Sequence, residues 1–502
     1  MKAVIDATLS EQGITKEQFI ENVAARMADI IRKRLIGNAK RTVVFAGPEL
    51  NGAYALAVSR ILALGGLNLE IYLFNIGGNR ANAECVAMRD KFRAECDPAM
   101  LTEVTSMQFD MPELTRHELF VDGLFGSERT QPLPGGYQAI VRHVNELGVR
   151  VVALDVPSGM LVDSIEGLIN RNIIHARYTL SIGGPRVAFF LKDNEELVGE
   201  WIDVQVPLSR SAVAKARTKF SMLDPSDIKR ILKPRSPFAS KADCGHAIIF
   251  AGSYGMLGAA VLSATGALRA GAGKVTVHAP RCGFFVMQNS VPCALFDVDP
   301  GDVAISQIEL LKDYDAVAIG PGIGTADVTI DALDSFLKIA NANSRPVVLD
   351  ADALNCISFR PAMLSHIPVL SILTPHEGEF DRLFGRQPSS YARLMKAIDE
   401  AERRHIIIIL KGRYTAVVWP DGNVYFNPTG TCALATGGTG DVLTGILAGF
   451  LAQGMRPERA ALAAPYVHGI AGILSSEAHG TFGVIASDVA DSVGRAISEA
   501  MK

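Results

Sequence analysis

The densest group of residues that could do chemistry lies near the C-terminus, in Ala435-Thr436-Gly437-Gly438-Thr439-Gly440-Asp441. A glycine-rich stretch that leads into an apolar helical pattern presents free backbone N–H groups and a positive dipole end, which suits a phosphate. Asp441 could accept a proton from an attacking hydroxyl while those N–H groups hold a transferring phosphoryl group. Taken alone, the segment is more simply interpreted as a turn with Asp441 as the helix N-cap.

Further polar or glycine-rich segments follow predicted strands in the same half of the chain. They are 251–260, 320–324, 350–355, 374–379 and 411–412. Singly, His376 could be a satisfied turn residue and Lys411 a solvated strand end, and His468, within a predicted helix, is expected to be structural. Because the carboxyl ends of parallel strands form one ligand-binding edge, the segments together predict a site there.

The elements that must position these residues form two series of alternating strands and helices. In the first series, strands are predicted at 42–46, 69–74, 119–121, 151–154, 178–182 and 201–206, with helices at 53–64, 83–95 and 137–147. In the second, strands are predicted at 247–250, 274–277, 316–319, 347–349, 371–373, 406–410 and 416–419, before helices at about 442–453, 458–478 and 487–501. Such alternation predicts mainly parallel sheets. The pattern breaks at 207–221, so we expect two α/β domains, 1–218 and 219–502.

Composition narrows the class of protein. A chain of 502 residues is too long for one ordinary core, and its net charge of −4 argues against a nucleic-acid partner. No apolar stretch is long enough to span a membrane, and the N-terminus lacks the apolar core of a signal peptide. The seven cysteines include no Cys-x-x-Cys pair, which predicts reduced thiols and a cytoplasmic protein.

The second half resembles the dehydratase domain of the NAD(P)H-hydrate repair enzymes, a ribokinase-like family. The resemblance spans roughly Leu223 to the C-terminus and rests on GSYGMLGAA, GPGIG, DADALN, TPHEGE, LKG and ATGGTGDVLTGILAGFLAQG. It implies dehydration of the S epimer of hydrated NADH or NADPH, using ADP (ATP in eukaryotes) and Mg²⁺, by a homo-oligomer. By motif, Asp441 would be catalytic, and Gly322 and His376 would contact the hydrate. The nucleotide would contact Lys411, Gly412, Thr415, Gly437, Gly438, Thr439 and Gly440. One departure is Thr431-Cys432-Ala433, where the family usually has Asn-Pro-Gly.

The first half resembles the epimerase domain of the same family, which has a Rossmann-like, doubly wound α/β fold and interconverts the R and S hydrates. The match covers about Val4 to Pro207 and includes 121–126 and 155–159. It implies that Asn51, Asp122 and Ser158 are K⁺ ligands, which supply the oxygen atoms that a hard cation prefers. Asn51 and Asp155 would also contact the substrate.

The phosphate loop of this half departs from the family pattern. The family has Gly-Pro-Gly-Asn-Asn-Gly-Gly-Asp-Gly, whereas 47–55 here read Gly-Pro-Glu-Leu-Asn-Gly-Ala-Tyr-Ala, and Arg186 replaces a lysine. Glu49 would place a negative charge beside an anionic ligand, and Ala53 and Ala55 restrict the backbone. We therefore expect a weak or inactive epimerase. Two alternatives stay open: a ribokinase-like kinase of a small alcohol such as a vitamin precursor, and an N-terminal half that is only a binding or assembly module.

Overall fold

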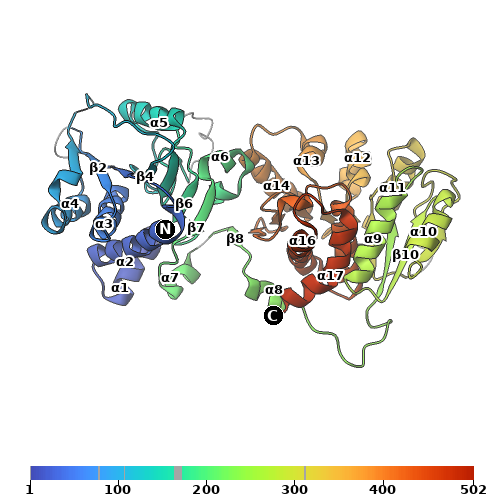
Figure 1. The fold of residues 1–502 in the computed structure, drawn as a ribbon. Helices are drawn as coiled ribbons and strands as arrows, with labels where there is room; N and C mark the ends of the chain where they lie inside the picture. The colour runs from blue at the N-terminus through green and yellow to red at the C-terminus, as the bar shows by residue number, and fades with distance from the viewer. Residues whose placement is uncertain (1, 77–79, 107, 163–171, 217, 310–312) are drawn as a thin grey trace. The chain divides into compact units, whose positions relative to one another are not determined.

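The computed structural model describes residues 2–76, 80–106, 108–162, 172–216, 218–309 and 313–502 (Figure 1). Contacts divide the chain into two compact units, Met1–Arg217 (unit 1) and Thr218–Lys502 (unit 2). This division falls inside the segment 207–221, where the pattern of the sequence breaks. Each unit contains its own sheet.

Unit 1 is built on a seven-stranded parallel sheet with the order β3-β2-β1-β4-β5-β6-β7. This is a doubly wound order, and its switch point lies between β1 and β4, where such folds bind ligands. The predicted Rossmann-like fold is therefore confirmed. The strands are β1 (Thr42–Ala46), β2 (Leu69–Phe74), β3 (Leu101–Val104), β4 (Leu119–Gly123), β5 (Arg150–Leu154), β6 (Tyr178–Ser181) and β7 (Glu200–Asp203).

Helices cover both faces of this sheet (Figure 1). Val44 and Ala46 of β1 pack in one core with α2, α3 and α4, whereas Val43 and Phe45 pack in another core with α5. Because side chains alternate along a strand, a strand buried on both faces is an uninterrupted apolar run. The helices are α1 (Lys2–Gln12), α2 (Lys16–Ile30), α3 (Leu50–Leu64), α4 (Ala83–Glu95), α5 (Gly135–Leu147), α6 (Glu195–Val198) and α7 (Arg210–Lys215).

Unit 2 has a ten-stranded sheet with the order β11-β10-β9-β12-β13-β14-β15-β16-β17-β8. It is parallel from β11 to β15, and β16 pairs antiparallel with both β15 and β17. The strands are β8 (Phe220–Met222), β9 (His246–Phe250), β10 (Lys274–Ala279), β11 (Leu295–Val298), β12 (Ala316–Ile319), β13 (Val348–Leu349), β14 (Ile372–Leu373), β15 (Ile407–Leu410), β16 (Ala416–Val418) and β17 (Val424–Phe426).

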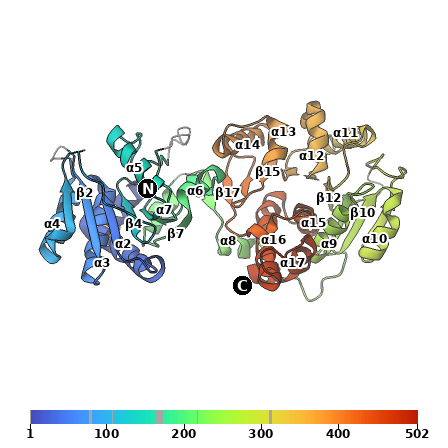
Figure 2. The ribbon, with the colours of Figure 1, turned by 45° about the horizontal axis from the view of Figure 1, so that its top comes forward.

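Helices α9, α15, α16 and α17 gather beside the middle strands of unit 2 (Figure 2). Helix α15 approaches α9 so closely that a Cβ on Gly445 would lie 2.1 Å from the carbonyl oxygen of Ser263. This contact between helices determines where the N-terminus of α15 points. The helices are α8 (Pro225–Ile231), α9 (Leu257–Arg269), α10 (Phe284–Ser290), α11 (Asp327–Ala342), α12 (Asp352–Phe359), α13 (Glu377–Phe384), α14 (Ser390–Arg404), α15 (Thr439–Ala452), α16 (Pro457–His479) and α17 (Ala486–Ala500). Across the described residues, we find no helix with the length and hydropathy needed to span a membrane.

Candidate active site

The glycine-rich turn forms the N-terminus of α15. Gly438 is the N-cap, with a φ of 93°, and a Cβ there would lie 2.6 Å from Cδ1 of Leu262. The Thr439 hydroxyl donates to the carbonyl oxygens of Leu434 (2.9 Å) and Thr436 (3.0 Å), which ties the turn to the preceding segment. Because no side chain caps α15, its first N–H groups are available to an anionic ligand.

Asp441 is in the first turn of α15, and the interpretation of it as the N-cap is wrong because Gly438 holds that position. No hydrogen bond between described residues ends on the Asp441 carboxylate. The pKa of Asp441 is raised to about 7, chiefly by burial and next by the Asp350 carboxylate, while the Lys411 ammonium opposes the shift. A carboxylate with a pKa near neutrality is suited to act as a general base.

Asp350 and Lys411 form an ion pair beside this turn. Nζ of Lys411 lies 3.0 Å from Oδ1 of Asp350 and 3.7 Å from Oε2 of Glu379. A Cβ on Gly440 would lie 3.6 Å from the same Nζ, so the ammonium sits against the turn. Burial would raise the pKa of Asp350, but the Lys411 charge and hydroxyl hydrogen bonds hold it below its usual value. The ends of β13 and β15 therefore meet α13 and α15 at one place.

The two residues predicted to contact the hydrate lie on the loops that follow β12 and β14, which are separated by β13 in the sheet. The carbonyl oxygen of Gly322 accepts a hydrogen bond from the Ser253 hydroxyl (2.8 Å), and a Cβ on Gly322 would lie 2.8 Å from the Met256 carbonyl oxygen. His376 is the N-cap of α13, where Nδ1 accepts hydrogen bonds from the N–H groups of Gly378 (3.0 Å) and Glu379 (3.3 Å). His376 thus has the turn role considered from the sequence, while Nε2 lies 3.5 Å from Oε1 of Glu379.

The loop that follows β15 carries the other predicted nucleotide contacts. The Thr415 hydroxyl donates to the carbonyl oxygen of Gly412 (3.1 Å), which closes the loop between β15 and β16. Gly437 and Gly412 are exposed. The structure brings Lys411 and Gly440 together beside Asp441.

Sequence reasoning missed Thr444. It is fully buried in α15, one turn beyond Asp441, and its hydroxyl donates to Oδ2 of Asp350 at 2.6 Å. The signal was its spacing, because residues three apart on a helix share a face. His468 of α16 is also buried, with Nε2 unpartnered among the described atoms, and the backbone of Thr439 hydrogen-bonds its ring.

Unit 1 has a second cluster of predicted site residues at the carboxyl ends of β1, β4 and β5. Asn51 is buried, and neither its amide oxygen nor its amide nitrogen has a hydrogen-bond partner among the described residues. Asp155 has a φ of 64° and accepts hydrogen bonds from the Ser127 N–H (2.8 Å) and Arg186 (3.2 Å). Such strain, which costs about 1–3 kcal/mol, concentrates at functional sites. Gly126 packs between the side chains of Asp155 and Asn51. A Cβ at this position would lie 3.1 Å from Oδ2 of Asp155 and 3.3 Å from Cγ of Asn51.

Asp122 and Ser158, the other predicted K⁺ ligands, are bonded to each other. The Ser158 hydroxyl donates to Oδ1 of Asp122 at 2.6 Å, and its N–H donates to Oδ2 at 2.8 Å. Burial raises the pKa of Asp122 to about 6, against the lowering effect of these hydrogen bonds. Unlike Asn51, Asp122 already has donors for both oxygens.

The departures in the loop 47–55 change the anion-binding end of α3. Glu49 is the N-cap of α3 but makes no capping hydrogen bond, and its carboxylate lies 3.1 Å from Nη1 of Arg129. The Arg129 guanidinium also stacks over Phe125, 4.6 Å from the ring centroid. Tyr54 is buried, and that burial raises the pKa of its hydroxyl. The helix end that would face a phosphate therefore carries a carboxylate and its own counter-charge.

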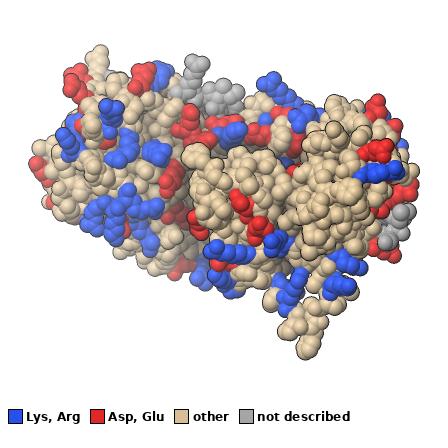
Figure 3. All heavy atoms as spheres, turned by 45° about the vertical axis from the view of Figure 1, so that its right-hand side comes forward, with Lys and Arg blue, Asp and Glu red and all other residues tan. Residues whose placement is uncertain are grey.

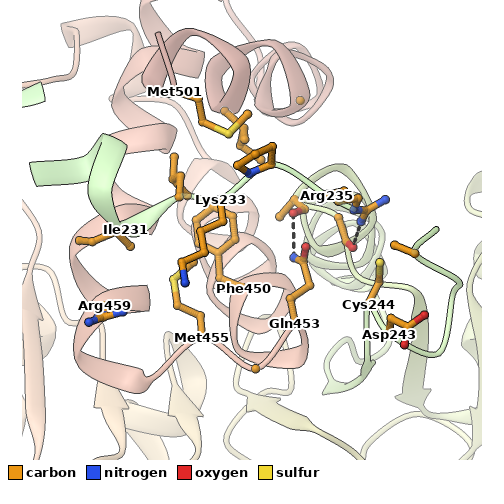
Figure 4. Close-up of a pocket in the computed structure, with 18 of the residues that line it drawn as sticks. Ile231, Lys233, Arg235, Asp243, Cys244, Phe450, Gln453, Met455, Arg459 and Met501 are labelled. Carbon is orange, nitrogen blue, oxygen red and sulfur yellow. Dashed lines mark hydrogen bonds between the residues drawn. The ribbon is translucent and has the colours of Figure 1, made fainter. Parts of the chain in front are cut away.

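A cavity of about 740 Å³ in unit 2 lies at the C-terminal ends of several helices (Figure 4). None of the predicted site residues lines it. Arg235 donates to the carbonyl oxygen of Gly271, and Nε2 of Gln453 donates to that of Ala270 at 3.0 Å. Cations and amides near helix C-termini stabilise the final carbonyl groups. We therefore assign these polar groups to helix capping.

Both acidic and basic side chains lie on the face that Figure 3 shows, and several Lys and Arg side chains gather at its left.

Comparison with known families matches both units. Residues 247–495 match the family described as NAD(P)H-hydrate dehydratase. Residues 16–188 match the family described as YjeF-related protein N-terminus. Each match falls within one unit and includes the cluster of polar residues described above.

Full-length relatives decide the assignment. The bifunctional NAD(P)H-hydrate repair enzyme Nnr of Moorella thermoacetica is 31% identical over 501 residues, which cover 96% of this chain and 92% of the relative. The enzyme of the same name from Gloeobacter violaceus is 31% identical, with 97% and 94% covered. The chain belongs to the bifunctional NAD(P)H-hydrate repair enzymes. The predicted family, in which an epimerase half precedes a ribokinase-like dehydratase half, is confirmed.

Among solved structures, this repair enzyme is similar to the ADP/ATP-dependent NAD(P)H-hydrate dehydratase from Bacillus subtilis, which was co-crystallized with ATP and Mg²⁺. That likeness has 32% sequence identity and a TM-score of 0.49, and it covers 56% of this chain and 98% of the other. The assignment to hydrate repair rests on the full-length relatives. Because those relatives are hydrate repair enzymes, a kinase with a stable phosphorylated product is the weaker alternative.

Proposed function

We propose that unit 2 dehydrates the S epimer of hydrated NADH and NADPH with ADP as the phosphoryl donor. The observation that carries this proposal is the juxtaposition of an uncapped helix N-terminus with Asp441, a carboxylate without a hydrogen-bond donor whose pKa is about 7. The full-length relatives, which are bifunctional NAD(P)H-hydrate repair enzymes, and the match of residues 247–495 to the NAD(P)H-hydrate dehydratase family support it.

The chemistry follows from the poor leaving ability of a ring hydroxyl. Asp441 takes the hydroxyl proton as the oxygen attacks the terminal phosphorus of ADP, and AMP leaves with the electrons of the broken P–O bond. The lone pair of the ring nitrogen then expels phosphate, and loss of a proton from the adjacent carbon restores the ring double bond. The N–H groups of Gly440 and its neighbours, with Lys411, would hold the transferring group. A positioned general base typically contributes about 10²–10⁴-fold.

The residues of the two units would hold the two implied cations, Mg²⁺ and K⁺, in different ways. No group of three or more His, Cys, Asp or Glu in the described part of the chain is arranged to hold a metal ion, so we propose that Mg²⁺ arrives on the nucleotide phosphates. In unit 1, the unpartnered amide oxygen of Asn51 fits a K⁺ ion. Asp122 and Ser158 would complete the oxygen set, and bound K⁺ would supply positive charge to the site.

Product analysis tests the proposal against the kinase alternative. Purified S-hydrate and ADP should yield NADPH, AMP and phosphate in equal amounts. A stable phosphorylated product without NADPH would instead identify a kinase of a small alcohol.

For unit 1 we propose weak epimerisation at most, with a binding or assembly role as the second candidate. The ion pair between Glu49 and Arg129 at the N-terminus of α3 favours this, because it occupies the end that would face a phosphate. Asn51 and Asp155 would still form a ligand pocket.

We further propose that 1–218 and 219–502 act as separate domains of a cytoplasmic homo-oligomer. All seven cysteines are free, as suits a reducing compartment.

The edge strand β11 and its surroundings expose several apolar side chains, Phe285 (75%), Leu295 (53%), Val298 (44%) and Val303 (53%), which suit an interface between copies. Light scattering of the purified protein would give a monomer mass if this proposal is wrong.

A further inference from the structure

Asp350 is the most deeply buried carboxylate of the unit 2 site. Its side chain ends β13 with only 1% of its surface exposed, and each oxygen has its own donor: Lys411 Nζ on Oδ1 at 3.0 Å and the Thr444 hydroxyl on Oδ2 at 2.6 Å. An isolated buried charge is strongly destabilising, and so is the removal of one partner from a buried ion pair. Asp350 therefore keeps both donors in place.

These donors come from two elements that the reaction needs to align. Lys411 follows β15, and Thr444 lies one turn beyond Asp441 in α15, so the Thr444 bond determines how α15 is rotated about its axis. A Cβ on Gly440 would lie 3.9 Å from Oδ2 of Asp350, so the turn rests against the same carboxylate. Ala351, which lies between Asp350 and Asp352 in the sequence, has a φ of 48°, a strained value for a residue other than glycine.

The charged groups around Asp441 shift its pKa in opposite directions. Asp350, Asp352 on α12 and Glu379 on α13 each raise the pKa of Asp441, whereas Lys411 lowers it. His468 on α16 is neutral near pH 7, because burial lowers its pKa to about 4. Lys411, the cation that lowers the pKa of Asp441, is bonded to Asp350 rather than to Asp441.

We propose that Asp350 is a positioning residue of the dehydratase site, which fixes Lys411 and the first turn of α15 through its two oxygens and leaves Asp441 free to accept the substrate proton. The inference rests on the proposed function of unit 2 and deepens it. An Asp350 that does not position α15 would leave kcat unchanged in a folded Thr444→Val variant, because that variant keeps the charge of Asp350 and removes only the hydrogen bond to α15.

The test compares three variants of the full chain. Asp350→Asn removes the charge and retains the size of the side chain. Thr444→Val removes one hydrogen bond and leaves the charge, and Asp352→Asn is the matched control that removes a neighbouring carboxylate not bonded to Lys411. The readouts are the pH profile of kcat/KM on S-hydrate, the separate values of kcat and KM for ADP, and calorimetry of ADP binding across pH without hydrate.

For Asp350→Asn we expect kcat to fall about tenfold or more and the acidic limb of kcat/KM to move down by about one pH unit or more. Thr444→Val should lower kcat while leaving that limb and the KM for ADP in place. Asp352→Asn should move the limb less than Asp350→Asn does. An unmoved limb in Asp350→Asn, or an equal shift in Asp352→Asn, would overturn the inference.

Calorimetry separates this inference from the proposed function. ADP binding should change its proton uptake near pH 7 in the wild type, and at lower pH in Asp350→Asn. If that shift occurs but no hydrate is dehydrated, the proposed function fails and the positioning role stands. If hydrate is dehydrated but proton uptake does not shift, the positioning role fails. Should Asp350→Asn not fold, Thr444→Val decides the matter, because unchanged kcat there contradicts the role of the carboxylate in aligning α15.

Discussion

Arg129 holds the Glu49 carboxylate 3.1 Å from its Nη1, at the N-cap of α3, where the epimerase family has a glycine. The two residues are 80 apart in sequence, and only Glu49 belongs to the loop 47–55. Glu49 places a negative charge at the N-terminus of α3, and the guanidinium of Arg129 neutralises that charge. A phosphate that approached α3 would have to displace this pair.

We therefore predict that R-hydrate is consumed far more slowly than S-hydrate. The full chain, supplied with pure R-hydrate and ADP while spontaneous epimerisation is slow, should form NADPH only at a small fraction of the S-hydrate rate. Adding an active epimerase from a relative should restore the rate, which serves as the control. Equal rates on the two epimers without that addition would show that the loop works despite Glu49.

A fragment of residues 218–502 should fold alone and keep the dehydratase activity. It retains β8, which pairs with β17, and the Lys219–Glu402 ion pair of 2.8 Å. A matched fragment of residues 223–502 lacks β8, so it leaves the β17 edge unpaired and should unfold at lower denaturant. Circular dichroism and the S-hydrate assay check both fragments, and an inactive or insoluble 218–502 fragment would contradict separate domains.

Asp441→Asn should make unit 2 more stable at a pH above 7. The pKa of Asp441 rises from 3.8 to about 7 on folding, so between these values the native state holds a proton that the unfolded state has released. The free energy of unfolding therefore falls as pH rises through this window, and asparagine removes that loss. We expect a gain on the order of 1–3 kcal/mol above pH 7 that vanishes near pH 4, measured by denaturant unfolding. A less stable variant above pH 7 would mean that Asp441 is a structural cap.

The activity should rise with pH through about 7 when followed as kcat/KM on S-hydrate, because the base must be ionised to accept the proton. The kcat of the enzyme saturated with both substrates should follow a different profile, since bound phosphates raise the proton affinity of a nearby carboxylate. A flat kcat/KM between pH 5 and 9 would exclude Asp441 as the titrating base.

The parts of the fold that sequence alone predicted are those with strong local patterns. β1 and β2 were placed at their observed bounds because apolar runs buried on both faces allow few alternatives. Helix α2 was missed although Thr15 and Gln18 form a capping box, a signal that the sequence carries. The short strands β8, β11 and β17 were also missed, since three or four residues have too little pattern of their own and pair only through distant partners.

The candidate site also has parts that local sequence patterns predicted and parts that they did not. The turn with Asp441 was visible as a motif because it leads into a helical pattern, and the loops with Lys411 and His376 were visible because each follows a strand. The bond from Thr444 to Asp350 joins residues 94 apart, and the Glu49–Arg129 pair joins residues 80 apart. Such contacts depend on how the sheet brings the loops together, and no local spacing encodes them.

The rate of NADPH formation from S-hydrate and ADP, compared between the wild type and Asp441→Asn, tests the central claim most directly. Calorimetry of ADP binding on both proteins controls for an intact nucleotide site. We predict that Asp441→Asn binds ADP with little change in affinity and loses turnover by about 10²-fold or more. Turnover close to that of the wild type in a variant that binds ADP normally would contradict the assignment of Asp441 as the base.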